Sequence, residues 1–88
     1  MTQNTNRTHA QMIAAGKIMA IAKGNTETIN KAIDLVIRTG ANAAAKRGTR
    51  GDVTAMMKFN SALKLLTAKS GLNPWGAIRN LAEASLTN

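Results

Sequence analysis

The chain has 88 residues, no cysteine, and twelve Lys and Arg against four Asp and Glu, which gives a formal net charge of +8. A chain of this length makes one domain, which buries only about 60 to 65% of the surface that its unfolded form exposes. The lack of cysteine excludes disulfides, thiolate nucleophiles and cysteine metal sites. The positive charge predicts an anionic partner, such as nucleic acid, an acidic protein face or an anionic lipid surface.

The N-terminal residues are polar and contain no apolar stretch of the kind found in secretory signals. The longest nearly apolar run covers residues 12–22 and includes Lys17, whereas a membrane span needs about 20 apolar residues. We therefore expect a cytoplasmic protein that does not enter a membrane. Residues 1–8 are expected to form a mobile tail, and residues 9–88 a single helical domain.

Residues 8–23 predict the first helix, because they are rich in Ala, Met, Ile and Lys and contain no proline. The large apolar side chains of this segment spread widely around the helix instead of forming one stripe. Such a helix needs burial on more than one side. It is either the central helix of a small bundle or a surface that is covered by a partner protein or by a second copy of the chain. A second copy would make the protein a homodimer.

The second helix is expected over residues 26–47, with Asn25 as its N-cap and Glu27 in its first turn. Apolar residues recur at steps of three and four from Ile29 onwards and make one continuous face. Two ion pairs are expected on the outer face, each between residues four apart: Glu27 with Lys31, and Asp34 with Arg38.

Small residues also repeat at a spacing of four. Gly16 and Ala20 have this spacing in the first helix, and Gly40 and Ala44 have it in the second. Because small residues let two backbones approach closely, this pattern predicts a tight crossing of the first two helices at these positions. The alternative is that Gly40 kinks or ends the second helix.

The stretch from Ala45 to Asp52 is the sharpest break in the chain and its densest positive charge. Gly48 suits the position just past a helix C-terminus, where Lys46 and Arg47 would complement the helix dipole. Asp52 suits the N-cap of the next helix. Arg50 is left without a structural explanation, which makes it a candidate binding residue.

The third helix is expected from Val53 to about Lys69, with Gly71 closing it in the left-handed conformation. The expected core face consists of Met56, Phe59, Leu63 and Leu66. The opposite arc mixes hydroxyl groups and cations around one exposed leucine, and consists of Thr54, Lys58, Ser61, Leu65 and Lys69. Such an arc can follow a phosphate backbone and touch base edges, although an ordinary solvated face has a similar composition.

The fourth helix is expected to begin with Asn73 as N-cap and Pro74 in the first helical position. Its inward face is expected to hold Trp75, Ile78, Leu81, Ala82 and Leu86. Trp75 is therefore predicted to be a large part of the core rather than a binding anchor, which is the alternative for an interface tryptophan.

Candidate catalytic groups are sparse. His9 is the one imidazole, and the four acidic residues are scattered along the chain. The stretch 48–51 lacks the spacing and the Lys-Ser or Lys-Thr ending of a nucleotide-binding loop. We therefore expect no enzyme, no cofactor and no metal site.

The sequence thus predicts an all-α protein, a small four-helix bundle with short turns. Its expected function is to bind nucleic acid through phosphate neutralisation, at Lys46, Arg47, Arg50, Thr54, Lys58, Ser61 and Lys69. Duplex DNA or structured RNA fits better than a single strand, because two aromatic residues offer no platform for stacked bases. The alternative is a small regulator, an inhibitor or adaptor of the kind that mobile elements encode, which binds an acidic or nucleoprotein surface of a larger machine. A virion role, in which the cations neutralise packaged nucleic acid, is a third interpretation.

Overall fold

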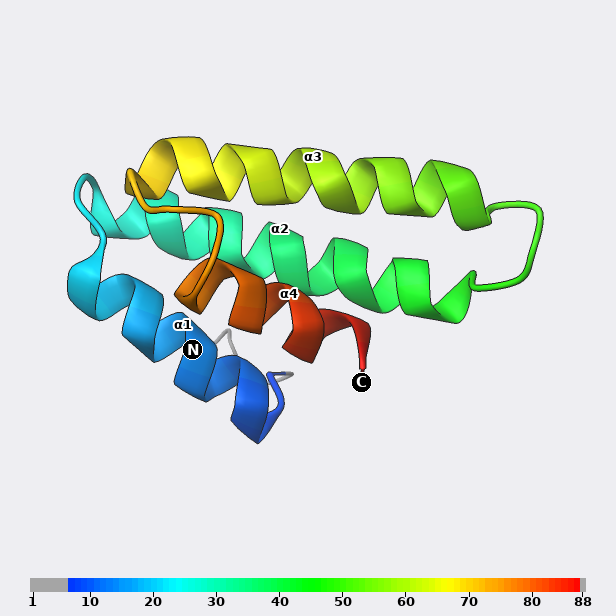
Figure 1. Ribbon diagram of the computed structural model, residues 1–88, viewed down its shortest axis with the longest axis horizontal. Helices are drawn as coiled ribbons and strands as arrows, with labels where there is room; N and C mark the ends of the chain where they lie inside the picture. The colour runs from blue at the N-terminus through cyan, green and yellow to red at the C-terminus, as the bar shows by residue number, and fades with distance from the viewer. Residues whose placement is uncertain (1–6, 88) are drawn as a thin grey trace.

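The computed structural model describes residues 7–87, which form four helices: α1 (His9–Ile21), α2 (Thr26–Ala45), α3 (Asp52–Ser70) and α4 (Ala77–Leu86). The two long helices α2 and α3 lie side by side and antiparallel, and α1 and α4 pack on the other side of α2 (Figure 1). Contacts between α3 and α4 are few. The predicted all-α four-helix fold is confirmed. None of the helices described here is long and apolar enough to cross a membrane.

Side chains cap the first two helices. The Thr8 hydroxyl accepts a hydrogen bond from the Gln11 backbone N–H at 3.2 Å, and the Gln11 side chain accepts from the Thr8 backbone N–H at 2.9 Å. The Asn25 side chain accepts from the Thr28 backbone N–H at 3.0 Å, which confirms Asn25 as the N-cap of α2. These bonds satisfy amides that would otherwise lack partners at a helix start.

Arg7 ties the beginning of the described chain to α2. Its guanidinium donates to the Asp34 carboxylate at 2.6 Å and to the Asn30 side chain at 3.0 Å, and its side chain is only 9% exposed. These contacts hold Arg7 and Thr8 against the helices, whereas the mobility expected of residues 1–8 stays a prediction. The rest of that expected tail, residues 1–6, lies outside the described residues.

The two ion pairs predicted on α2 are wrong. Within residues 7–87, the ion pairs join Arg7 to Asp34 and Arg79 to Glu83, the second at 3.4 Å. Asp34 thus has a partner from outside its own helix, and both Lys31 and Arg38 are exposed without a carboxylate partner in this part of the chain.

The core lies where α2 meets α3 on one side and α4 and α1 on the other. Phe59 and Leu66 are buried as predicted, but the core face of α3 is completed by Ala55 and Ala62. The predicted core residues Met56 and Leu63 are only partly buried at its edge. Alanines at this contact let α2 and α3 approach closely.

Helix α1 is covered on one side only. It buries Gln11, Ala14, Ala15 and Ile18, whereas Met12, Ile13 and Ile21 remain about half exposed. The expectation of a central helix is therefore wrong within this chain. A second copy on this surface remains a prediction.

Helix α2 runs without a break through Gly40, and the predicted crossing of α1 and α2 at the small residues is wrong. A Cβ atom added to Gly40 would lie 2.5 Å from the Ser85 Cβ atom on α4 and 3.0 Å from the Phe59 ring on α3. A Cβ atom added to Gly16 would meet nothing within 4 Å. Gly40 therefore allows the close approach of α2 to α4.

Helix α4 begins at Ala77, three residues later than the predicted first position at Pro74. The Asn73 side chain accepts from the Trp75 backbone N–H at 2.9 Å, so it closes a turn instead of capping a helix. Gly76, the residue before the helix, has φ +83°, a conformation that favours glycine. Trp75 lies in this turn and does not share the helical phase of Ile78. It is 65% exposed, so its predicted place in the core is wrong.

Candidate nucleic-acid interface

Three of the predicted site residues line a groove between α2 and α3. This α2–α3 groove has a volume of about 600 Å³ and is lined by Leu35, Thr39, Thr54, Met57, Lys58, Ser61, Ala62 and Leu65. Its position follows from the periodicity of α3. Because Ala55, Phe59, Ala62 and Leu66 face the core at steps of three and four, Thr54, Lys58, Ser61 and Leu65 are exposed along the neighbouring arc.

The hydroxyl groups of the groove differ in what they can offer a ligand. The Thr39 hydroxyl donates to the Leu35 carbonyl of its own helix at 2.7 Å, so its proton is already engaged. The Thr54 and Ser61 hydroxyls have no hydrogen-bond partner within the described residues. Both can donate to a phosphate oxygen, and they lie on α3 on either side of Lys58.

Two further cations share this face. Lys31 and Arg38 lie four residues before and three residues after Leu35, which lines the groove, so they belong to the same face of α2. Both are exposed. The sequence alone does not indicate them as binding residues, because each has an acidic residue four positions earlier and is therefore expected in an ion pair. Their spacing from Leu35 was the signal that would have found them.

The connection between α2 and α3 is held by its own hydrogen bonds. The Thr49 hydroxyl donates to the Lys46 carbonyl at 2.6 Å, and the Gly48 backbone N–H donates to the Asp52 carboxylate at 3.2 Å. Helix α2 ends at Ala45 with Lys46 as its C-cap, two residues before the expected end at Arg47, so Gly48, with φ +78°, lies within the connection and does not end the helix. The predicted N-cap at Asp52 is wrong, since Gly51 holds that position and Asp52 is the first helical residue.

The three predicted loop cations are in different environments. The Arg47 guanidinium donates to the Leu86 carbonyl at the end of α4, at 3.4 Å, which satisfies a carbonyl that lacks a helical partner. The Lys46 side chain lies across Gly51, where an added Cβ atom would be 3.3 Å from the Lys46 Cδ atom. Arg50 is exposed, and its side chain makes no hydrogen bond or ion pair within the described chain. Arg50 is thus the loop cation most available to a ligand.

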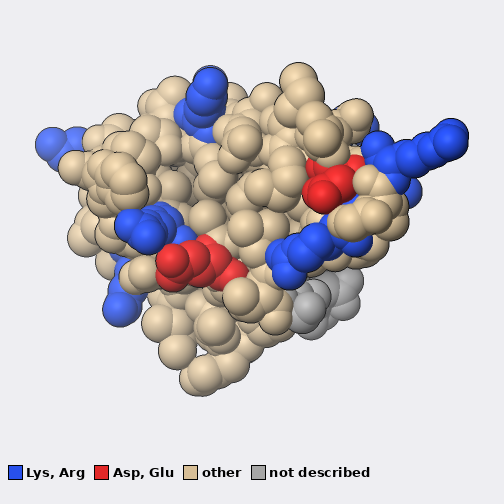
Figure 2. All heavy atoms as spheres, turned by 45° about the vertical axis from the view of Figure 1, so that its right-hand side comes forward, with Lys and Arg blue, Asp and Glu red and all other residues tan. Residues whose placement is uncertain are grey.

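The predicted site residues do not all lie together. Lys69 is in the last turn of α3, about 26 Å along the helix from the loop at its first turn. Figure 2 brings the end of the molecule that carries the loop forward. On that face the blue side chains are separated by tan surface, and red ones lie directly beside some of them. The groove residues Thr54, Lys58 and Ser61 therefore form one group, and Lys69 stands apart.

The described part of the chain shows few groups for chemistry. Within residues 7–87, no cluster of three or more His, Asp or Glu side chains is placed to hold a metal ion. His9 is exposed at the start of α1. What the arrangement offers is a set of exposed cations and free hydroxyl groups, which suits the binding of an anionic polymer.

Comparisons of the chain with protein-family models, with curated proteins and with solved structures found no match.

Proposed function

We propose that the protein binds nucleic acid, in the form of duplex DNA or structured RNA, by neutralising phosphate charge, and that it is not an enzyme. One observation carries the proposal. Ten of the twelve Lys and Arg side chains have no carboxylate partner within residues 7–87, and all ten are exposed. Two of the four acidic residues are already neutralised in ion pairs. The surface therefore carries a large excess of uncompensated positive charge.

The face of the α2–α3 hairpin is the part of this surface that best fits a phosphate backbone. Lys58 lines the α2–α3 groove from α3, Lys31 and Arg38 lie on the same face of α2 as the lining residue Leu35, and no described carboxylate lines the groove. The Thr54 and Ser61 hydroxyls are free to donate to phosphate oxygens. Hydroxyl and cationic groups at phosphates fix the position of a protein on a helix without reading its sequence.

The expected salt dependence follows from the number of cations. If Lys31, Arg38, Lys46, Arg50 and Lys58 each neutralise one phosphate of B-form DNA, the slope of log K against log salt is roughly −4.5. Raising the salt concentration from 50 to 200 mM would then weaken binding by about 500-fold.

Fluorescence anisotropy with a labelled 20-base-pair duplex of random sequence, and with an RNA hairpin, tests the proposal across a salt series. The variant that carries Arg38→Gln and Lys58→Gln should bind more weakly and show a slope smaller by about 2. The variant that carries Lys17→Gln and Lys23→Gln has the same net charge and changes residues outside this face, so it is the matched control. A third variant, with Lys46, Arg47 and Arg50 changed to Ala, tests the loop.

Three results would count against the proposal or part of it. Wild-type affinity weaker than about 100 μM at physiological salt lies outside the usual range of nonspecific binding and would refute nucleic-acid binding as the function. Equal losses in the two double variants would show that net charge, and not the α2–α3 face, determines binding. Binding that the triple change leaves untouched would remove the loop from the site.

A further inference from the structure

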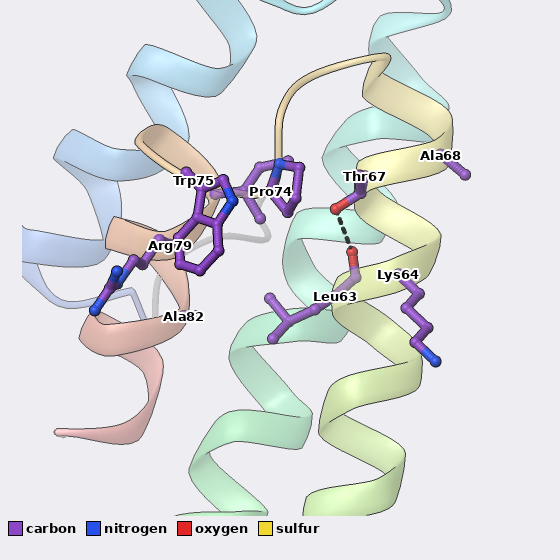
Figure 3. Close-up of a pocket in the computed structure, with 9 residues that line it drawn as sticks. Leu63, Lys64, Thr67, Ala68, Pro74, Trp75, Arg79 and Ala82 are labelled. Atoms are coloured by element: carbon purple, nitrogen blue, oxygen red, sulfur yellow. Dashed lines mark hydrogen bonds between the residues drawn. The ribbon is translucent and has the colours of Figure 1, made fainter.

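A second groove lies on the other side of α3, where the chain passes into α4. This α3–α4 groove has a volume of about 590 Å³ and is lined by Leu63, Lys64, Thr67, Ala68, Pro74, Trp75, Ile78, Arg79 and Ala82. Figure 3 shows Trp75 and Pro74 on one side and Leu63 and Thr67 of α3 on the other. The groove exists because α4 packs on α2 and α1 and touches α3 only slightly.

The floor of the groove is apolar. The Thr67 hydroxyl donates to the Leu63 carbonyl at 2.9 Å, so its proton is engaged within α3. Leu63, Ile78 and Ala82 contribute only hydrocarbon, and Trp75 is 65% exposed. A tryptophan in this position exposes a large apolar area that a protein partner would remove from water.

Cations stand at the two outer edges of this floor. The Lys64 amine on α3 and the Arg79 guanidinium on α4 point away from each other on opposite sides (Figure 3). Arg79 lies 5.3 Å from the centre of the Trp75 ring and makes a 3.4 Å ion pair with Glu83. Lys64 is exposed and has no carboxylate partner in the described chain. No described carboxylate lines the groove.

We infer that the α3–α4 groove binds a short acidic, amphipathic segment of another protein. Its apolar anchors would cover Trp75 and Leu63. One of its carboxylates would meet the unpaired Lys64, and another would replace Glu83 as the partner of Arg79 in an ion pair that is exposed to solvent. In such recognition, apolar anchors in the groove usually provide the affinity, and charges at the rim select the partner.

Charge decides between this occupant and two others. A second copy of this chain carries a net charge of +8, so its own cations would be brought toward Lys64 and Arg79. A nucleic acid would satisfy the two cations, but the hydrocarbon floor offers base edges no hydrogen-bond partner. An acidic amphipathic segment would cover the apolar floor with its hydrocarbon side chains and pair its carboxylates with the cations at the edges.

This inference does not depend on nucleic-acid binding. Leu63 and Thr67 lie on one flank of α3, and Lys58 and Leu65 lie on the other, with the buried face of the helix between them. The two grooves therefore have different lining residues, so an exposed side chain of one groove can be changed without changing a residue of the other.

The test is a selection from a random library of 16-residue peptides displayed on phage, with wild-type protein as bait and the Leu63→Glu variant for counter-selection. Selected peptides are then synthesised and titrated while the emission of Trp75 is recorded. Trp75 is the only tryptophan and the chain has no tyrosine, so the signal reports on this groove alone. Circular dichroism checks that each variant is folded.

We expect the selected peptides to combine Glu or Asp with apolar residues at helical spacing, and to shift the Trp75 emission to shorter wavelength. Lys64→Glu should weaken them severalfold, whereas the matched change Lys17→Glu on α1 should not. Leu63→Ala should weaken them by about 10-fold or more. Peptides that are basic or neutral, or the failure to find any binder that depends on Leu63, would overturn the inference.

Two further outcomes would assign the groove to another occupant and also overturn it. Quenching of Trp75 by the 20-base-pair duplex, in a manner that Lys64→Glu abolishes and Lys17→Glu does not, would assign the groove to nucleic acid. A shift of Trp75 emission with protein concentration alone, accompanied by a doubling of mass in light scattering, would assign it to a second copy. Failure of duplex binding in the anisotropy assay would leave the peptide result unaffected.

Discussion

Changing Gly40 to Ala tests the closest helix contact in the fold. The added Cβ atom would lie 2.5 Å from the Ser85 Cβ atom, 3.0 Å from a Phe59 ring carbon and 3.2 Å from the Ser85 carbonyl carbon. Two of these three atoms belong to the α4 backbone or are fixed directly to it. A rotamer change cannot relieve the clash, so α4 must move away from α2.

The change in the free energy of unfolding is the difference between the cost of overpacking and the gain in helix propensity. Overpacking of this kind costs about 1 to 3 kcal/mol, and the direct clash with α4 places Gly40→Ala in the upper part of that range. Replacing glycine by alanine inside a helix raises the free energy of unfolding by about 1 kcal/mol. The net loss is about 1 to 2 kcal/mol, which lowers the Tm of a domain of this size by roughly 5 to 15 °C.

Thermal denaturation followed by circular dichroism measures this shift, and Gly16→Ala is the matched control. Gly16 is also inside a helix, but an added Cβ atom meets nothing within 4 Å, so this variant should gain up to about 1 kcal/mol. Adding Ser85→Gly to Gly40→Ala removes the nearest atom and should recover part of the loss, with a favourable coupling energy in a double-mutant cycle. A Gly40→Ala variant as stable as Gly16→Ala would refute the close approach of α2 and α4.

Two other changes separate structural residues from exposed ones. Arg7→Ala removes a largely buried partner of Asp34 and should lower the free energy of unfolding, measured by urea denaturation, by about 1 to 2 kcal/mol. Arg38→Ala breaks no ion pair and should change it by less than about 0.5 kcal/mol. Equal effects of the two changes would contradict the Arg7 contact. Trp75→Ala should change the free energy of unfolding by less than about 1 kcal/mol, because the side chain is exposed. Leu81→Ala, at a fully buried position, should lower it by about 2 to 5 kcal/mol. A comparably large loss for Trp75→Ala would show that Trp75 is part of the core.

The sequence predicted the helices well because their ends carry local signals. Asn25 caps α2 and Gly71 takes the left-handed conformation after α3, as expected from the residues alone. Such signals act between residues a few positions apart, so they survive without knowledge of the tertiary structure. The all-α fold followed from them.

The errors lie where a distant residue decides the outcome. Asp34 pairs with Arg7, and Gly40 faces Ser85. In both cases the two residues are far apart in the sequence. Helical spacing could not anticipate these contacts. The predicted start of α4 was wrong for a different, local reason: both Asn73 and Pro74 favour a turn as well as a helix start, and in the structure they form a turn. The shift of three residues moved Trp75 from the core to the surface.

The exposure of α3 on two flanks follows from the same packing. Ala55 and Ala62 allow α3 to lie close to α2, and Gly40 allows α4 to lie close to α2. Both α3 and α4 are therefore positioned by α2 and make few contacts with each other. The space left between them is the α3–α4 groove, and the opposite side of α3 forms the α2–α3 groove. A side chain larger than alanine at position 62 would move α3 and alter both grooves together. The small residues of the core therefore determine the geometry of both grooves, although Ala62 is the only one of them that lines either groove.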